Sequence, residues 1–331
     1  MPHVHITRRS GIPLIGCLYF GVIDRGTSLL QVRPSCRCNL SCPFCSVDAG
    51  PDSRTRVTSY EVEREYLVET VRSIAQFKVA GVEAHIDSPG EPMLYPDIVA
   101  LVRDLRKIPE ISVISMQSNG TLLREGVIAD LASAGLDRIN LSMHALDPDL
   151  ARCLAGVSWY DVTAVAEAAR AIAQSSIDLL ISPVHLPGLN DEEIPRLIRF
   201  ARTTGAGKRW PPLGIQKFEE YRWGRTPPNV HPQSWGRFFS KTLPAWEEES
   251  GMRLRLTPAD FAIEKRPMIP RVFRKGERAE VEIVGPGWIQ GEVLGAGRGR
   301  VVSVMGSRKR SGTTRVRFVS AKHNIYVAVP A

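Results

Sequence analysis

Three cysteines lie close together at Cys38, Cys42 and Cys45, with the spacing C-x3-C-x2-C. A short loop of this kind can present its thiolates to one [4Fe-4S] cluster. Three protein ligands leave one iron open, and an open coordination position favours chemistry at the metal. The alternatives are a structural zinc site and chance clustering. Structural zinc prefers four protein ligands from paired C-x2-C knuckles, and the sequence has no second knuckle, so the pattern favours the cluster.

The string CNLSCPFC (residues 38–45) resembles the signature of the radical S-adenosylmethionine (SAM) superfamily. In that family the open iron chelates the amino and carboxylate groups of SAM. Electron transfer then cleaves SAM into methionine and a 5′-deoxyadenosyl radical. Phe44 fits the aromatic residue that usually precedes the third cysteine. The resemblance extends over residues 28–225. It implies a [4Fe-4S] cluster held by the three cysteines, SAM as a second cofactor, and an electron donor such as ferredoxin or flavodoxin.

The segment SPGEP (residues 88–92) resembles the Gly-Gly-Glu motif with which this family binds the SAM ammonium group. Gly90 permits an exposed backbone, and Glu91 offers a charge-assisted acceptor. Pro89 replaces the first glycine and removes one amide donor, which puts the geometry of that contact in doubt. An ordinary turn is the alternative.

The resemblance places further SAM contacts at the ends of later predicted strands. The segment QSNGT (residues 117–121) is similar to the family's Thr-Asn-Gly segment, although Asn-Gly is also common in plain turns. The residues expected to contact SAM, together with Phe44, Pro89, Gly90 and Glu91, are Ser118, Asn119, Ser142, Pro183 and Gln216.

The sequence does not identify a catalytic residue, but four side chains are candidates. His144 lies two residues beyond Ser142, on the same face if the strand continues, and is a proton donor, a substrate contact or a structural histidine. Gln216 lies near the end of the predicted strand 213–218 and is a candidate contact for adenine or substrate. Tyr221 lies in a charged and aromatic segment, residues 219–225, that either faces substrate or is a solvated loop. Cys153 is a methyl carrier or, as favoured, a small apolar residue on a helix.

Alternating strands and helices must position these loops. Strands are expected at 29–33, 82–87, 111–116, 138–142, 177–181 and 213–218, and helices at 59–77, 97–106, 125–134, 160–173 and 192–202. Ser59 is the expected N-cap of the first helix. This order predicts an α/β fold with a parallel sheet, and the resemblance implies a partial (β/α)6 radical SAM barrel over residues 28–225. The active site of such a barrel lies at the C-terminal ends of the strands.

Three other regions flank this barrel. Residues 1–27 are expected to form an N-terminal β-hairpin extension, with apolar β-rich runs such as residues 12–20 and a turn at 24–27. Residues 226–270 read as a Pro-rich connector with one helix at 234–250. Residues 271–331 contain short alternating strands at 278–284, 291–294, 301–305, 314–319 and 324–329, which predicts a small all-β barrel of OB or TRAM type.

Composition sets broader limits. The chain has 331 residues, of which 43% are apolar and 24% charged, as in ordinary globular proteins. No apolar run reaches the length of a membrane span, and the first residues do not have the form of a signal peptide. Cysteines clustered in this way favour a reducing compartment. We therefore expect a cytoplasmic protein without a membrane partner.

The net positive charge arises from the C-terminal region. The whole chain has a net charge of +8, and residues 271–331 hold 12 Lys or Arg against 4 Asp or Glu, so the remainder is neutral. Such an asymmetry indicates a polyanionic partner. Trp288, Phe318 and Tyr326 either stack bases or fill the barrel core. The candidate RNA-binding residues are Lys275, Arg298, Arg300, Arg308, Lys309, Arg310, Arg315, Arg317 and Lys322.

Residues 275–329 resemble a TRAM domain, which several tRNA-modifying enzymes carry, and the whole chain is similar to a group of archaeal radical SAM proteins with this tail. The resulting hypothesis is a radical SAM enzyme that modifies RNA, with a tRNA nucleoside as substrate and DNA not expected. C-methylation of a hypermodified adenosine near the anticodon is one concrete candidate. The alternatives are an enzyme that modifies a protein or peptide, with the tail as a docking module, and a non-catalytic iron–sulfur or RNA-binding protein.

Overall fold

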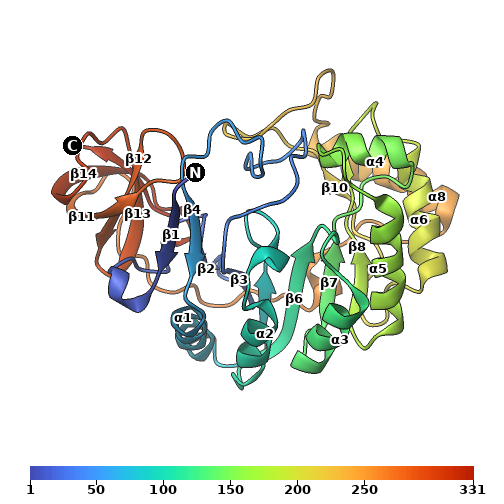
Figure 1. Ribbon diagram of the computed structural model, residues 1–331, viewed down its shortest axis with the longest axis horizontal. Coiled ribbons are helices and arrows are strands. Elements are labelled where there is room, and N and C mark those ends of the chain that lie inside the picture. The colour runs from blue at the N-terminus through green and yellow to red at the C-terminus, as the bar shows by residue number, and fades with distance from the viewer. The chain divides into compact units, whose positions relative to one another are not determined.

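The structure, a computed structural model, describes residues 1–331 and divides into two compact units. The first comprises residues 1–38, 53–114 and 264–331, and the second comprises residues 39–52 and 115–263. Figure 1 shows the helices and strands of both. No helix combines the length and apolar character needed to cross a membrane. The domain boundaries proposed from the sequence stay predictions.

A six-stranded sheet has the strand order β2-β3-β5-β6-β7-β8. Strand β2 (Gly21–Asp24) is antiparallel to β3 (Leu29–Arg33), which is parallel to β5 (Val82–Ile86). Strand β6 (Ile111–Ser118) is parallel to β7 (Arg138–Leu141), and β7 is parallel to β8 (Asp178–Ile181). Most of their side chains are buried, as in parallel strands covered on both faces. The predicted α/β fold is confirmed.

The sixth predicted strand, residues 213–218, does not join this sheet. Leu213 makes only an isolated bridge to Ile181, and β10 (Gln216–Lys217) pairs with β9 (Val184–His185) in a separate two-stranded sheet. Pro183 lies between the two pairings and has no N–H to donate, so the ladder cannot run through it. The sixth strand of the sheet is β2 instead.

Two expectations for the N-terminal half are wrong. Residues 12–20 form no strand, and β1 (His3–Ile6) pairs in parallel with β4 (Ser59–Val62). The predicted helix at 59–77 therefore begins later, as α1 (Arg64–Lys78) with Glu63 at its N-cap. Tyr60 and Val62 are buried while their neighbours are partly exposed, and this period of two belongs to a strand. Helix α2 (Ile98–Arg106) agrees with its prediction.

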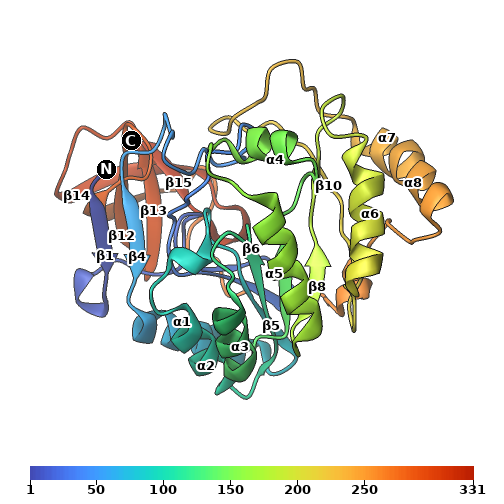
Figure 2. The ribbon, with the colours of Figure 1, turned by 45° about the vertical axis from the view of Figure 1, so that its right-hand side comes forward.

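The second unit contains the remaining long helices. Helix α3 (Glu125–Ala134) ends at left-handed Gly135, as predicted. Helices α5 (Val162–Gln174) and α6 (Glu193–Thr204) both contact β8 (Figure 2). No range was predicted for helix α4 (Pro148–Ala155), although Cys153 was expected on a helix. The helix expected at 234–250 is present, as α7 (Trp235–Arg237), a π-helical segment (Phe238–Thr242) and α8 (Leu243–Ser250).

The last residues form a closed barrel with the order β11-β12-β13-β15-β14, which confirms the five predicted strands. The strands are β11 (Arg278–Pro286), β12 (Glu292–Gly297), β13 (Arg300–Met305), β14 (Gly312–Ser320) and β15 (Val327–Pro330). Phe318 and Tyr326 are fully buried in its core. Trp288 is also buried, with its ring centroid 3.9 Å from that of Tyr19. All three aromatic residues are therefore core residues, and the base-stacking alternative is wrong.

Candidate functional site

The cysteine loop follows the C-terminal end of β3. Cys38, Cys42 and Cys45 are all partly exposed, whereas Cys17 and Cys36 are buried. Burial raises the pKa of the Cys17 thiol to about 12 and that of Cys36 to about 11. A metal ligand must be a thiolate, and buried thiols with raised pKa values are inert. The structure thus separates the three cysteines of the signature from the two buried ones.

The loop has a fixed local geometry. The amide of Cys45 donates to the carbonyl of Cys42 at 3.1 Å, and the amide of Ala49 donates to the sulfur of Cys45 at 3.3 Å. No three His, Cys, Asp or Glu side chains converge on a single metal position. The thiolates of a four-iron cluster bind different irons, so they need not converge in that way. Partly exposed thiols on a turn fit such a cluster, and an amide donor stabilises the negative charge on one of them.

A network of side-chain amides ties the cysteine loop to the end of β6. The Asn119 amide donates to Asn39 Oδ1 at 2.9 Å, and the Asn39 amide donates to Thr121 Oγ1 at 2.8 Å. Thr121 Oγ1 in turn donates to Asn119 Oδ1 at 2.7 Å. The predicted contact of Asn119 with SAM stays a prediction, and its carboxamide also holds the loop through Asn39. Asn39 and Thr121 were missed, although Asn39 lies inside the cysteine string.

Two further segments of the second unit hold this loop. The Ser41 amide donates to the carbonyl of Ala155 at the end of α4, and a Cβ on left-handed Gly156 would lie 2.1 Å from the Ser41 oxygen. The Arg225 amide donates to the carbonyl of Cys45 at 2.8 Å, and its guanidinium lies 3.4 Å from Asp48. The predicted substrate-facing segment 219–225 therefore ends in an anchor for the loop.

The Gly-Glu motif lies against the start of the loop within the first unit. The Glu91 amide donates to the carbonyl of Arg37 at 2.8 Å. A Cβ on Gly90 would lie 2.0 Å from that oxygen and 3.1 Å from the amide nitrogen of Cys38, so only glycine fits. The Glu91 carboxylate is buried and accepts a hydrogen bond from the Met93 amide at 3.0 Å. Pro89 is buried as well.

The remaining predicted SAM contacts form two pairs: Ser118 and Ser142 at the ends of β6 and β7, and Pro183 after β8 with Gln216 in β10. Ser142 accepts a hydrogen bond from the Gln117 amide group at 2.7 Å, and its backbone amide donates to the Ser118 carbonyl. Gln216 is exposed, donates to Ser182 Oγ at 2.9 Å, and has its backbone amide on the Pro183 carbonyl. The parallel strands of this unit thus end in adjacent polar groups, as expected for the site edge of such a sheet.

His144 packs edge-on against Phe44, with ring centroids 4.9 Å apart. Its Nδ1 accepts a hydrogen bond from the Val184 amide at 3.0 Å. Burial lowers the pKa of this imidazole to about 4. The neutral ring supports Phe44, the residue before the third cysteine. This contact favours a structural role for His144 over a role as proton donor. Tyr221 and Cys153 are exposed, and Cys153 lies on α4.

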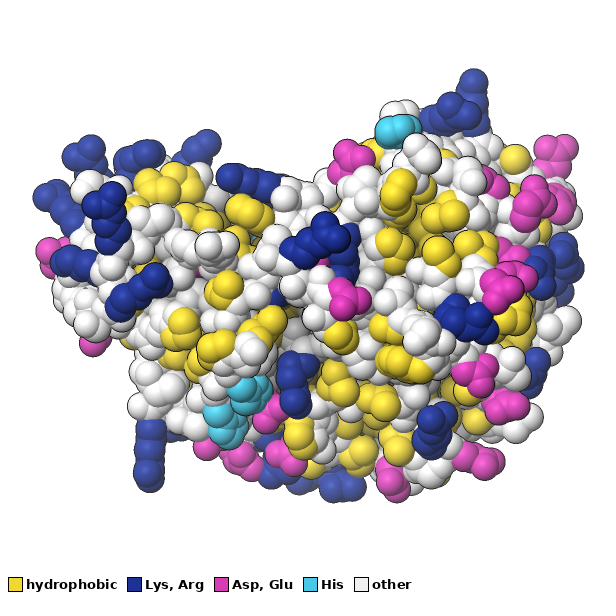
Figure 3. Space-filling model, turned by 45° about the horizontal axis from the view of Figure 1, so that its top comes forward, with side chains coloured by type: hydrophobic (Ala, Val, Ile, Leu, Met, Phe, Trp, Pro, Cys, Tyr) yellow, Lys and Arg dark blue, Asp and Glu magenta, His cyan; other side chains and the backbone are white.

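The predicted RNA-binding residues lie on the first unit, where Figure 3 shows Lys and Arg side chains gathered over the barrel region at the left. Arg298 is paired with Glu277 at 2.7 Å, and Arg300 donates to the carbonyls of Gly299 and Pro270. The other seven are exposed, namely Lys275, Arg308, Lys309, Arg310, Arg315, Arg317 and Lys322.

Comparison with known proteins defines the family. Residues 32–201 match the Radical SAM superfamily. The chain is 39% identical to the uncharacterized protein MJ0103 of Methanocaldococcus jannaschii, over 96% of this chain and 78% of that protein. The chain therefore belongs to the radical SAM superfamily, with a [4Fe-4S] cluster and SAM as its cofactors.

Other similarities are narrower. The GTP 3′,8-cyclase of Chlorobaculum tepidum is 29% identical over 61% of this chain, and the match spans 58% of the cyclase. A probable GTP 3′,8-cyclase of Methanothermobacter thermautotrophicus is 31% identical over 56% of this chain and 58% of its own. The crystal structure of Streptococcus suis SuiB bound to S-adenosylmethionine superposes with a TM-score of 0.54 at 19% identity, covering 73% of this chain and 51% of SuiB. This likeness shows the fold alone.

Proposed function

We propose that this radical SAM enzyme modifies RNA and that its substrate is a tRNA nucleoside. The observation that carries the proposal is the charge distribution. The entire positive excess lies in residues 271–331, which fold into a closed barrel with exposed Lys and Arg side chains. Such side chains bind phosphates without regard to sequence. The C-methylated form of a hypermodified adenosine near the anticodon is the product that we would seek first.

In this proposal Cys38, Cys42 and Cys45 hold the cluster. When bound, the cluster and SAM supply the deoxyadenosyl radical that abstracts a hydrogen atom from the substrate. The chain's own part is to position and enclose these groups. Glu91 supplies a buried carboxylate for the SAM ammonium group. The rings of Phe44 and His144 pack against each other beside Cys45, and this packing limits the access of water.

The remaining SAM contacts are proposed on the strand ends. They are Ser118 at the end of β6, Ser142 after β7, Pro183 after β8 and Gln216 in β10. Gly90 contributes its backbone, and Pro89 leaves one donor fewer than the usual motif. Asn119 is proposed as a further SAM contact, and its hydrogen bond to Asn39 also holds the cysteine loop.

Two measurements test the proposal together. Anaerobically reconstituted enzyme, given dithionite and SAM, should release 5′-deoxyadenosine, and Cys45→Ala should abolish both bound iron and this product. Mass spectrometry of tRNA nucleosides from a strain lacking the protein should show one missing modification. Formation of 5′-deoxyadenosine with an unchanged tRNA nucleoside profile would favour the protein or peptide substrate instead.

A further inference from the structure

An open cavity of about 510 Å³ lies in the first unit, and two of its lining residues, Lys275 and Lys322, were predicted to bind RNA. Three segments that are distant in the sequence form its walls. They are the turn after β2 with Arg25, the connector with Arg271 and Lys275, and the loop after β14 with Lys322 and His323. We call this cavity the basic cleft. Arg25, Arg271 and His323 were not singled out by the sequence.

The basic cleft carries only positive charge. Four of its lining residues are Lys or Arg, one is His, and none is acidic. The carboxylate of Asp24 lies beneath it, but that group is fully buried and paired with Lys78 at 2.9 Å. Desolvation and the charges of Arg25, Lys322 and Arg271 lower the pKa of His323, and the Asp24 charge opposes this change. Four cationic side chains in one hollow that no acidic residue lines favour an anionic ligand.

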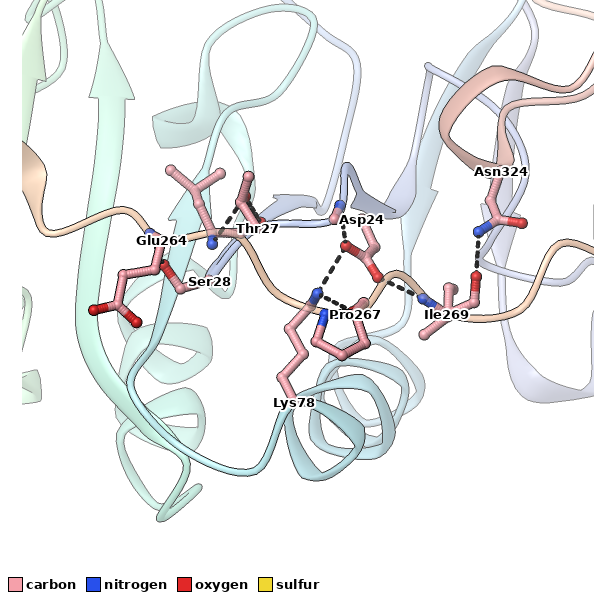
Figure 4. A network of polar contacts seen from close by, with 10 residues as sticks. Asp24, Thr27, Ser28, Lys78, Glu264, Pro267, Ile269 and Asn324 are labelled. Atoms are coloured by element: carbon pink, nitrogen blue, oxygen red, sulfur yellow. Dashed lines mark hydrogen bonds and ion pairs between the residues drawn. The ribbon is translucent and has the colours of Figure 1, made fainter. Parts of the chain in front are cut away.

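Ile269 in the connector forms hydrogen bonds to the other two walls of the basic cleft. The Ile269 amide donates to Asp24 Oδ2 at 2.8 Å, and the Asn324 side-chain amide donates to the Ile269 carbonyl at 2.8 Å. Figure 4 shows these bonds together with the contacts of Lys78 to Asp24 and Pro267. The cationic residues are therefore mounted on a rigid frame, which lowers the entropy cost of ligand binding.

The loop after β14 is held in an unfavourable conformation. His323 and Asn324 both adopt left-handed backbone angles, with φ of 55° and 57°. Asn tolerates this region, but His does so less readily. Buried Asn324 is fixed by the Ile269 carbonyl and by the Tyr326 hydroxyl, which donates to its Oδ1. Backbone strain of this kind persists where surrounding contacts over-determine it and concentrates at ligand sites.

We propose that the basic cleft binds phosphate groups of the RNA backbone, an inference that rests on the proposed RNA substrate. Arg25, Arg271 and Lys322 are the phosphate contacts, and His323 supplies a further donor. No aromatic side chain other than His323 lines the cleft, so it offers little platform for a base. Its open form and lack of such a platform fit a phosphodiester chain better than a free nucleotide.

The test is tRNA binding by the full-length reconstituted enzyme across a salt series. The variant is R25A/K322A, and the matched control is R103A/R199A, which removes the same charge from exposed arginines on α2 and α6. Loss of two phosphate contacts should reduce the slope of log affinity against log salt by about 2 and lower affinity at 0.1 M salt by about tenfold or more. The control should keep the slope of the unmodified enzyme.

The outcomes separate the two proposals. Full affinity and slope in R25A/K322A, with tRNA bound by the unmodified enzyme, would overturn the basic cleft and leave the RNA substrate standing. Equal losses in both variants would also overturn it, since charge alone would then explain binding. Displacement of tRNA by stoichiometric GTP, with GTP affinity lost in R25A/K322A, would assign the cleft to a free nucleotide. If the unmodified enzyme fails to bind tRNA, both proposals fall.

Discussion

Replacing Lys78 with Met should destabilise the first unit strongly. Both side chains of the Lys78–Asp24 pair are completely buried, and their charged atoms lie 2.9 Å apart. Lys78 also donates to the Pro267 carbonyl at 3.0 Å. The substitution keeps the volume of the side chain but leaves the Asp24 carboxylate buried without its cation. The segments that form the basic cleft also lose the contacts of Lys78 with Asp24 and Pro267.

The size of the loss in stability depends on the hydrogen bonds that Asp24 keeps in the variant. Removing one partner of a buried ion pair costs about 3–5 kcal/mol. Asp24 keeps two backbone donors, Gly26 and Ile269, each at 2.8 Å, which favours the lower end of that range. The Pro267 carbonyl loses its donor, at a further cost of about 1 kcal/mol. We therefore expect a loss of about 4 kcal/mol, of which the double variant D24N/K78M should recover about 2 kcal/mol, because it buries no unpaired charge.

Urea unfolding gives the free energies, and hydrogen exchange locates the change. The backbone amides of Gly26 and Ile269 should exchange faster in Lys78→Met, since both donate to Asp24. Lys107→Met is the matched control, because Lys107 is largely exposed in its pair with Asp104 and should lose less than about 1 kcal/mol. Equal losses in the two Met variants, or no change in exchange at Ile269, would refute the reasoning.

Two further predictions concern the cysteine loop. Gly90→Ala should cost the reconstituted enzyme most of its iron, because the new Cβ would lie 2.0 Å from the Arg37 carbonyl. The control Gly126→Ala has open space around its new Cβ, so it should keep all of its iron and gain about 0.5–1 kcal/mol of helix stability. Equal iron contents in the two variants would contradict this prediction. His144 has a folded-state pKa of about 4 against about 6.5 when unfolded, so the unfolded chain binds more protons between these values and stability falls as pH drops through them, by about 3 kcal/mol in total. Urea unfolding at several pH values should show that His144→Gln flattens this dependence, and an unchanged slope would exclude His144 as its source.

The loop chemistry could be predicted from the sequence because its signal is local. The cysteine spacing and the Gly-Glu motif are short runs of neighbouring residues, and the structure places a close contact with the Arg37 carbonyl where Gly90 was expected to matter. The SAM contact of Asn119 came from the resemblance of residues 117–121 to a family segment, and it stays a prediction. Its hydrogen bond to Asn39, 80 residues away in the sequence, could not be predicted, because no pattern specifies such a pairing.

The errors in the fold have the same origin. Residues 59–62 read as a helix start, yet pairing with β1, more than fifty residues earlier, makes them a strand. Local propensity is a weak prior that tertiary contacts override. The predicted strand at 213–218 does not pair along the sheet, because Pro183 in the neighbouring segment cannot donate a hydrogen bond to the ladder. Both features depend on what the chain meets across a sheet, which periodicity along one segment does not describe.

Burial of the barrel aromatics limits what the C-terminal region can recognise. Phe318 and Tyr326 fill the core and Trp288 packs on Tyr19, so none is available to stack on a base. The exposed Lys and Arg side chains recognise phosphates, which position an RNA but do not specify its sequence. If RNA is the substrate, this region supplies affinity with little sequence preference. The choice of nucleoside must then depend on RNA shape and on the residues around the cysteine loop.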